Sequence, residues 1–279
     1  FDPSEMKVVA EVPLPFSADS LAAYNWPVSG REAVRLAYQR RPAWQICPAG
    51  PETLMFMPAI MPDNIARGMV MDASVLQGKQ YEWGGKDMFG IEWRFDPAAG
   101  GSMVVPGSPA VSDANEIEEK IQWPDVDRWD WEGSAKENAV LLDCDKSVNM
   151  TIFTGWFERL ISFMDFDGAA LALIDEDQKD AVKAFFDKLS DLYIQILEHV
   201  FRYFPAVDVF SIHDDWAGQR ITFFSPETAE EMIVPYMRKV TDFIHANGRF
   251  ADLHSCGQSL EQVPNFIKAG WDSWLPQSI

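Results

Sequence analysis

Residues 251–257, which read Ala-Asp-Leu-His-Ser-Cys-Gly, combine two side-chain types that are well suited to binding a metal. The short apolar run from Arg249 to Leu253 predicts a strand that leads into them. Because side chains alternate along a strand with a period of two residues, His254 and Cys256 are expected to share a face. Imidazole and thiolate are preferred zinc ligands, and a catalytic zinc takes three protein ligands and leaves one position open. The pair therefore predicts half of a metal site, and the structural alternative is a buried thiol beside a hydrogen-bonded core histidine.

A second group of polar residues follows another predicted strand, Val207 to Ile212. His213, Asp214 and Asp215 come next, and they are candidate catalytic residues because a carboxylate at a strand end serves as an additional metal ligand or handles protons. Which of the two aspartates faces inward depends on the register of the strand, so both remain open. The structural alternative is an acidic cluster that stabilises a loop or caps a helix.

Helices and strands alternate along much of the chain. The capping box Ser29 to Glu32 opens a helix that is expected to run to about Arg40. Apolar residues spaced three and four apart predict a long helix from Asp177 to Tyr203. The remaining predictions are a strand from Ala43 to Cys47, a strand within Leu141 to Phe153, a helix from Trp156, a helix from Ser225-Pro226 to Asn247-Gly248, a helix near Leu260 to Ala269 and a strand from Asp272 to Pro276.

This alternation is typical of βα units around a parallel sheet, and the length of 279 residues favours a (β/α)8 TIM-type barrel over an open sheet. We expect one barrel domain over residues 1–279, an N-terminal extension over about 1–28, and an inserted loop and hairpin region over about 81–131. Fewer than eight βα units are visible, so C-terminal units are expected beyond Ile279. Active sites of such barrels form at the carboxyl ends of the strands, where both polar groups lie.

Composition excludes some classes of partner. A formal net charge of −20 argues against nucleic acid, because binding a phosphate backbone requires a basic surface. No run of about 18 apolar residues predicts a membrane span, and no signal segment opens the sequence. The three scattered cysteines, Cys47, Cys144 and Cys256, are typical of reduced thiols, so we expect a cytoplasmic protein.

Eleven tryptophans are many for this length, and they suit a pocket for a flat or apolar substrate. The candidate substrate contacts are Trp44, Asp87, Trp156 and Trp216. For each of them the structural alternative is packing in the core or, for Asp87, a turn.

Several stretches together resemble the uroporphyrinogen decarboxylase superfamily. They are residues 213–220 (His-Asp-Asp-Trp-Ala-Gly-Gln-Arg), Phe224-Ser-Pro226, Val234-Pro-Tyr236, His245-Ala-Asn-Gly248, His254-Ser-Cys-Gly257 and Ala269-Gly270, with weaker similarity at residues 41–44 and 87–93. This ordered similarity covers the last third of the chain and implies a TIM-type barrel.

The superfamily has two branches with different chemistry. Its decarboxylases carry an arginine-rich loop after the first strand, whereas residues 45–52 of this chain contain no arginine. Its methyltransferases use zinc and a separate corrinoid protein, and their pattern includes a His-x-Cys pair, which His254 and Cys256 match, and a later cysteine, which this chain lacks. The resemblance thus implies a methyltransferase that moves a methyl group between a corrinoid protein and a small methylated compound, such as an aromatic methyl ether, or a thiol.

Two other functions compete with this interpretation. The first is a uroporphyrinogen decarboxylase, in which Asp87 or Asp214 would stabilise the pyrrole nitrogens of a tetrapyrrole. The second is a corrinoid carrier without catalysis, but the cobalt-ligating signature Asp-x-His-x-x-Gly is missing from the sequence. The zinc-dependent methyltransferase is therefore the leading hypothesis.

Overall fold

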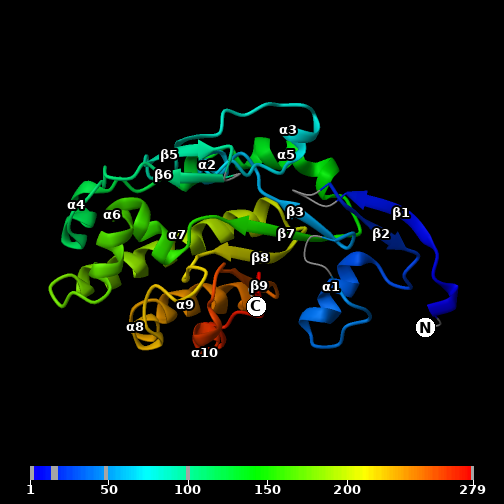
Figure 1. Ribbon diagram of the computed structural model, residues 1–279. Coiled ribbons are helices and arrows are strands. Elements are labelled where there is room, and N and C mark those ends of the chain that lie inside the picture. Colours follow the sequence, from blue (N-terminus) through cyan, green and yellow to red (C-terminus); the bar gives the residue numbers. More distant parts are fainter. Residues whose placement is uncertain (1–2, 14–17, 47–49, 99–100, 278–279) are drawn as a thin grey trace.

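A computed structural model describes residues 3–13, 18–46, 50–98 and 101–277, and at its centre lies a five-stranded parallel sheet (Figure 1). The strands are β3 (Thr53–Phe56), β7 (Ser147–Ile152), β8 (Val207–His213), β9 (Phe250–His254) and β10 (Ser273–Leu275). Their spatial order, β10-β9-β8-β7-β3, follows the chain without a reversal, as it does in barrels. The predicted α/β class is confirmed, and β3 and β10 end the sheet within the described residues. Closure into a barrel stays a prediction.

Helices cover the sheet and its ends (Figure 1). They are α1 (Gly30–Tyr38), α2 (Pro62–Ala66), α3 (Ala73–Leu76), α4 (Ile117–Lys120), α5 (Trp131–Leu142), α6 (Trp156–Ala172), α7 (Lys179–Tyr203), α8 (Pro226–Met232), α9 (Val234–Ala246) and α10 (Val263–Lys268). Short 3-10 helices span Pro3–Glu5, Ala114–Glu116, Val126–Arg128 and Leu260–Gln262. In the described part of the chain, no helix is both long enough and apolar enough to cross a lipid bilayer.

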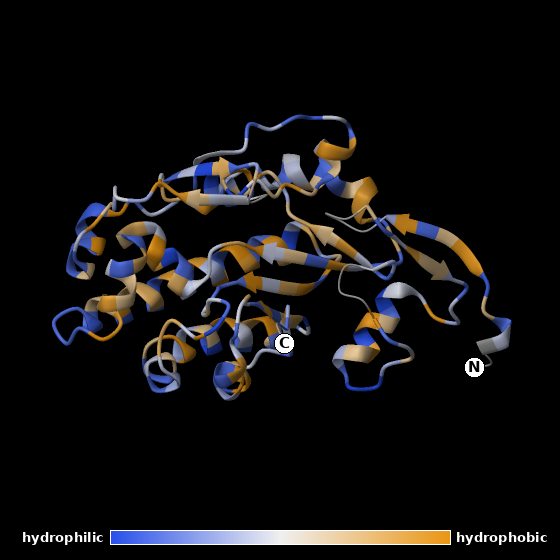
Figure 2. Cartoon of the chain, in the orientation of Figure 1, coloured by the Kyte–Doolittle hydropathy of each residue, from blue (hydrophilic) through white to orange (hydrophobic). Residues whose placement is uncertain are grey.

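Local sequence explains where several helices begin. The Ser29 side chain accepts a hydrogen bond from the backbone N–H of Glu32, so the predicted cap of α1 is confirmed. The long helix α7 buries the predicted apolar face, including Phe186 and Ile196, and packs against α9. Figure 2 shows hydrophobic and hydrophilic residues alternating along these outer helices, as expected for helices with one buried side.

Three predicted elements differ in the structure. Residues 43 and 44 form a bend and residues 45 and 46 have no regular structure, so the described part of the strand predicted from Ala43 to Cys47 is not a strand; Cys47 lies outside the described residues. The indole of Trp44 packs on Trp26, with 4.0 Å between ring centroids, and the first strand of the central sheet is β3 instead. Leu141 and Leu142 end α5, so the next strand begins only at Ser147.

The single helix predicted from residue 225 to 247 is divided. Ser225 accepts a hydrogen bond from the backbone N–H of Thr228 and begins α8, as expected. At Ile233 the backbone leaves helical geometry, and Pro235, which has no N–H, lies in the first turn of the following helix α9. The proline therefore separates the two helices.

Two small antiparallel sheets lie outside the central sheet (Figure 1). Strands β1 (Val8–Pro13) and β2 (Ser20–Tyr24) pair within the expected N-terminal extension. Strands β4 (Gly84–Lys86), β5 (Glu92–Asp96) and β6 (Gly101–Val104) pair within the expected insertion. Helix α2 contacts β4 and β5, so this second sheet packs on the segment that follows β3.

Candidate functional site

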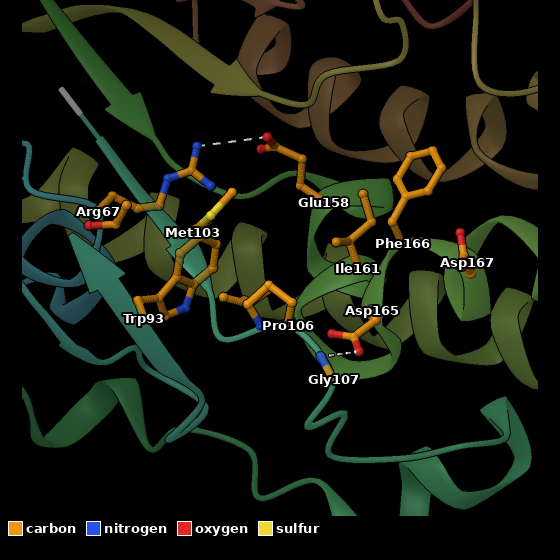
Figure 3. A pocket seen from close by; sticks show the side chains of 12 residues that line it. Arg67, Trp93, Met103, Pro106, Gly107, Glu158, Ile161, Asp165, Phe166 and Asp167 are labelled. Atoms are coloured by element: carbon orange, nitrogen blue, oxygen red, sulfur yellow. Dashed lines mark hydrogen bonds and ion pairs between the residues drawn. The ribbon is translucent and has the colours of Figure 1, made fainter. Parts of the chain in front are cut away.

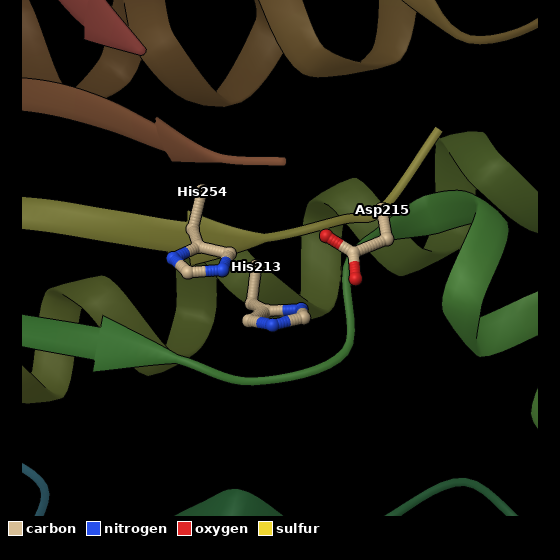
Figure 4. A group of neighbouring side chains, drawn as sticks. All are labelled: His213, Asp215 and His254. Carbon is tan, nitrogen blue, oxygen red and sulfur yellow. The ribbon is translucent and has the colours of Figure 1, made fainter. Parts of the chain in front are cut away.

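The polar residues predicted to do chemistry meet where β8 and β9 end. His213 and His254 are direct partners in the parallel register of these strands. Their rings stack with a centroid separation of 4.3 Å and an interplanar angle of 13°, and Asp215 lies beside them (Figure 4). The carboxyl edge of the sheet therefore brings both polar sequence groups into one place.

Four side chains at this edge offer atoms that metals bind. The ligand atoms of His213, Asp215 and His254 lie within 4.8 Å of one another. The Sγ atom of Cys256 is 3.2 Å from Nε2 of His254, and the backbone N–H of Cys256 donates to Oδ1 of Asp215 at 2.6 Å. Nitrogen, sulfur and oxygen ligands in one cluster suit zinc, and the histidine and cysteine come from the predicted pair.

The protonation of the pair fits a cation. Burial, followed by the positive charge of His213, lowers the pKa of His254 to about 4, which leaves a neutral imidazole with a free lone pair at neutral pH. Burial, followed by the negative charges of Asp215 and Glu158, raises the pKa of the Cys256 thiol to about 11. A bound cation would favour the thiolate form of Cys256 and would be attracted by the negative charges of Asp215 and Glu158.

Glu158, in the first turn of α6, is a site residue that sequence reasoning missed. Its Oε2 lies 2.8 Å from Nδ1 of His213, and its Oε1 lies 3.7 Å from the Arg67 guanidinium. Burial alone would raise the pKa of Glu158, but the charges of His213 and Arg67 hold it at about 2. Burial would lower the pKa of His213, and the attraction of Glu158 outweighs it and raises that pKa.

A sequence signal for Glu158 existed. It follows β7 by a few residues, just as His213 and His254 end β8 and β9, so all three lie at the carboxyl edge of the sheet. A search for polar residues after every predicted strand would have found it.

Asp214 serves a different purpose from its neighbours because its side chain is fully buried. It accepts hydrogen bonds from the backbone N–H groups of Phe157 and Glu158 and from Nε1 of Trp216. Burial, followed by the charge of Glu158, raises its pKa to about 7. A Cβ atom on Gly155 would lie 2.5 Å from that of Asp214, so only glycine allows this close approach. The geometry is that of a helix cap for α6, which is the structural alternative stated for this cluster.

Two cavities adjoin the cluster. One, of about 460 Å³, has His213 and His254 in its wall together with Met55, Met57, Met69, Phe153, Arg67 and Ser102. The other, of about 540 Å³, lies between β5, β6 and α6 and is lined by Trp93, Met103, Ile161 and Phe166 (Figure 3). Arg67 and Ser102 line both, so they stand where the two cavities meet. Such volumes suit small organic molecules.

The predicted substrate contacts do not line either cavity. Trp156 and Trp216 are fully buried, and Nε1 of Trp156 donates to Ser190. Trp44 stacks on Trp26 and donates to Glu52, which precedes β3, so it lies near the amino ends of the strands. Trp156 and Trp216 therefore occupy packing positions, whereas Trp44 and Trp26 line a separate cavity of about 400 Å³. Aromatic residues that fill a core and those that line a pocket look alike in sequence.

Asp87 is likewise turned away from the cavities. It is buried and forms an ion pair with Arg159, with Oδ2 2.6 Å from the guanidinium. It also accepts hydrogen bonds from the backbone N–H groups of Phe89 and Ile91 and from Nε1 of Trp93. These hydrogen bonds to the backbone that follows it agree with the alternative that Asp87 stabilises a turn.

Comparison with known proteins extends the picture at the level of fold. No protein-family model and no curated protein sequence matches this chain. Among solved structures, a methyltransferase from Methanosarcina mazei is similar, with a TM-score of 0.57 and 14% sequence identity over 89% of this chain and 76% of that chain. At this identity the similarity concerns the fold, and this chain shares its α/β architecture with that methyltransferase.

Proposed function

We propose that this protein is a zinc-dependent methyltransferase that moves a methyl group between a small methylated compound or a thiol and a corrinoid protein. One observation carries the proposal: His213 and His254 lie in the wall of a cavity large enough for a small substrate, and Asp215 and Cys256 lie beside these histidines. The fold that this chain shares with a methyltransferase and the sequence resemblance to the uroporphyrinogen decarboxylase superfamily support it. We place the protein in the cytoplasm, with no nucleic acid or membrane as partner.

Three protein ligands, drawn from four residues, would form the metal centre. His254 and Cys256 would hold zinc, and His213 or Asp215 would be the third ligand. When bound, zinc would polarise a departing oxygen or keep a thiol substrate deprotonated at neutral pH. Without a metal, His254 and Cys256 offer no Lewis acid, and the raised pKa of Cys256 keeps its thiol protonated at neutral pH.

The surrounding residues would orient these groups and handle protons. Glu158 holds Nδ1 of His213, which fixes the ring and leaves Nε2 as the nitrogen that binds the metal or exchanges a proton with the reacting group. Asp214 holds the first turn of α6 and therefore the position of Glu158. The apolar wall formed by Met55, Met57 and Phe153 would keep water away from the methyl group.

The decarboxylase alternative gains no support from the geometry. Asp87 and Asp214 would have to face a tetrapyrrole, but both are buried and their oxygens accept hydrogen bonds from neighbouring N–H groups. We therefore retain methyl transfer as the proposed function.

Metal analysis together with a methyl-transfer assay tests the proposal. The purified protein is expected to hold about one zinc per chain and to transfer methyl groups between a corrinoid protein and small methylated compounds. His254→Ala and Cys256→Ala are expected to lose both the zinc and the activity, because each removes one ligand. Cys144→Ala is the matched control, since Cys144 is a free thiol outside the cluster. Full methyl transfer by metal-free protein would exclude the proposal.

A further inference from the structure

Arg67 is the cationic side chain at the junction of the two cavities, and its hydrogen-bonding capacity is largely unused. A guanidinium has five N–H donors. Among the described residues, the closest carboxylate oxygen belongs to Glu158 at 3.7 Å, which is too long for a hydrogen bond. The shorter contact of Glu158, at 2.8 Å, is with His213. Arg67 therefore compensates charge without forming a short hydrogen bond.

Aromatic rings hold the Arg67 guanidinium in place. Its central carbon lies 4.9 Å from the ring centroid of Trp93 and 5.5 Å from that of Phe153. Stacking on aromatic rings occupies the faces of a guanidinium and leaves its N–H groups, which lie in the plane, for other partners. Figure 3 shows the Arg67 side chain reaching toward Glu158, with Trp93 of β5 next to Arg67.

Ser102, on β6, adds a second unused donor at the same place. Its Oγ is buried and has no hydrogen-bond partner among the residues that the structure describes. Ser102 and Arg67 line both cavities together. A buried hydroxyl without a partner costs stability, and a ligand oxygen would relieve that cost.

We propose that Arg67 and Ser102 bind the carboxylate of a small aromatic acid, whose methyl-bearing end then reaches the cluster around His254. Only the placement of the methyl-bearing end at the cluster rests on the proposed function, because the carboxylate site is built without the metal. His254 and Arg67 line the same cavity of about 460 Å³, so one small molecule can reach both. Phe153, Met55 and Met57 line this cavity too, and they suit the ring of such an acid.

The charges around Arg67 favour a single negative charge. A carboxylate matches a guanidinium through two parallel hydrogen bonds. Glu158 faces Arg67 and Asp215 lies beside His213, so a ligand with two or more negative charges would be repelled. The site thus selects a monocarboxylate over a phosphate ester or a polycarboxylate, even though the whole chain carries a net charge of −20.

Calorimetric titration with matched ligands tests this site without a methyl-transfer assay. The probes are benzoate, 3-methoxybenzoate and 4-methoxybenzoate, each paired with its uncharged amide. Wild-type protein is expected to bind at least one acid about tenfold or more tightly than the matching amide. Arg67→Gln should abolish this preference, Arg67→Lys should retain part of it because the charge remains, and Ser102→Ala should weaken acid binding by a few fold.

Arg94→Gln is the matched control. Arg94 lies on β5 next to Trp93 but is exposed, so its replacement should leave the preference for acids unchanged. Circular dichroism and thermal unfolding of the Arg67→Lys protein establish that the fold is retained. Equal binding of acids and amides by the wild type, no binding of any acid, or loss of the preference in Arg94→Gln but not in Arg67→Gln would overturn the inference. A protein that prefers acids but holds no zinc and transfers no methyl group would refute the proposed function and leave the carboxylate site standing.

Discussion

At the scale of single residues, the site depends on pairs of side chains that fix each other's charge. Glu158 raises the pKa of His213, and the charges of His213 and Arg67 together outweigh burial and hold the pKa of Glu158 at about 2. The neighbouring imidazole of His254 is held neutral by burial and by the charge on His213. Two stacked histidines thus have opposite shifts because only one of them contacts a carboxylate.

Replacement of Glu158 by glutamine tests this pairing. Glu158→Gln keeps the shape but removes the charge that orients His213 and raises its basicity. Zinc affinity is expected to fall about 10- to 100-fold, as it does when a carboxylate behind a histidine ligand is lost. A competition titration with a zinc chelator measures it.

Glu118→Gln provides the comparison, because Glu118 pairs with Lys188 at the surface. It should bind zinc as the wild type does. Unchanged zinc affinity in Glu158→Gln would show that His213 takes no part in the metal site.

At the scale of elements, a buried aspartate on β9 connects this strand to α1 and β10. Asp252 accepts hydrogen bonds from the Tyr38 hydroxyl at 2.7 Å and from the Ser273 hydroxyl. Burial raises the pKa of Asp252, the hydrogen bonds from Ser273 and Tyr38 lower it, and the charge of Asp272 raises it again, with a net rise. The strand that positions His254 is therefore fixed at its middle by a carboxyl group that disfavours ionisation.

The stability of Asp252→Asn is expected to depend on pH in a defined direction. The pKa of Asp252 is higher in the folded protein than the ordinary value of 3.8, so ionisation of this carboxyl group at neutral pH lowers the free energy of unfolding. The wild type regains that free energy as the pH falls through the folded-state pKa toward 3.8. The asparagine variant has no such charge, so it should unfold at a higher urea concentration than the wild type at pH 7. This advantage should shrink as the pH approaches 3.8.

Asp242→Asn is the matched control on α9, because Asp242 is exposed and pairs with Arg238 at the surface. At pH 7, Asp242→Asn should unfold at the same urea concentration as the wild type. If the stability of Asp252→Asn relative to the wild type were lower at pH 7 than at pH 4, the pKa of Asp252 would be lowered by folding, and the prediction would be wrong.

At the scale of the whole molecule, a buried ion-pair cluster joins segments that are far apart in sequence. Arg159 on α6 pairs with Asp63 on α2 and with Asp87, which lies between β4 and β5. All three side chains are buried. This cluster connects the antiparallel sheet of the insertion to the helix that carries Glu158.

Removing the cation from this cluster is expected to lower the free energy of unfolding. Arg159→Met leaves two buried carboxylates without a cationic partner and should lower the free energy of unfolding by about 3–5 kcal/mol. Adding Asp63→Asn to this variant removes one of the unpaired charges and should restore part of the loss. Denaturant titrations followed by circular dichroism measure both effects.

The exposed pair of Lys136 and Glu132 provides the comparison, since Lys136→Met should change the free energy of unfolding far less than Arg159→Met does. A loss in Arg159→Met as small as that would mean that the cluster contributes no more than a surface pair. A single cooperative transition in the wild type would support the prediction of one domain.

The sequence by itself determined the features that depend on neighbouring residues. Periodicity identified α7, capping residues located the starts of α1 and α8, and the alternation of strands with helices identified the α/β class. The spacing of His254 and Cys256 also predicted that these two side chains lie together, and they do, although β9 ends at His254 and Cys256 follows the strand. The strand predicted from Ala43 to Cys47 is not formed over its described residues, 43–46, where Trp44 packs on Trp26, a contact that a local pattern does not reveal.

Only the tertiary structure decided which residues join across the sheet. The register of β8 and β9 brings His213 beside His254, and the packing of α6 brings in Glu158 from a third segment. It also separated the two aspartates by burial, turning Asp214 toward the helix end and leaving Asp215 at the cluster. These contacts depend on the three-dimensional path of the chain, which composition and spacing do not encode residue by residue.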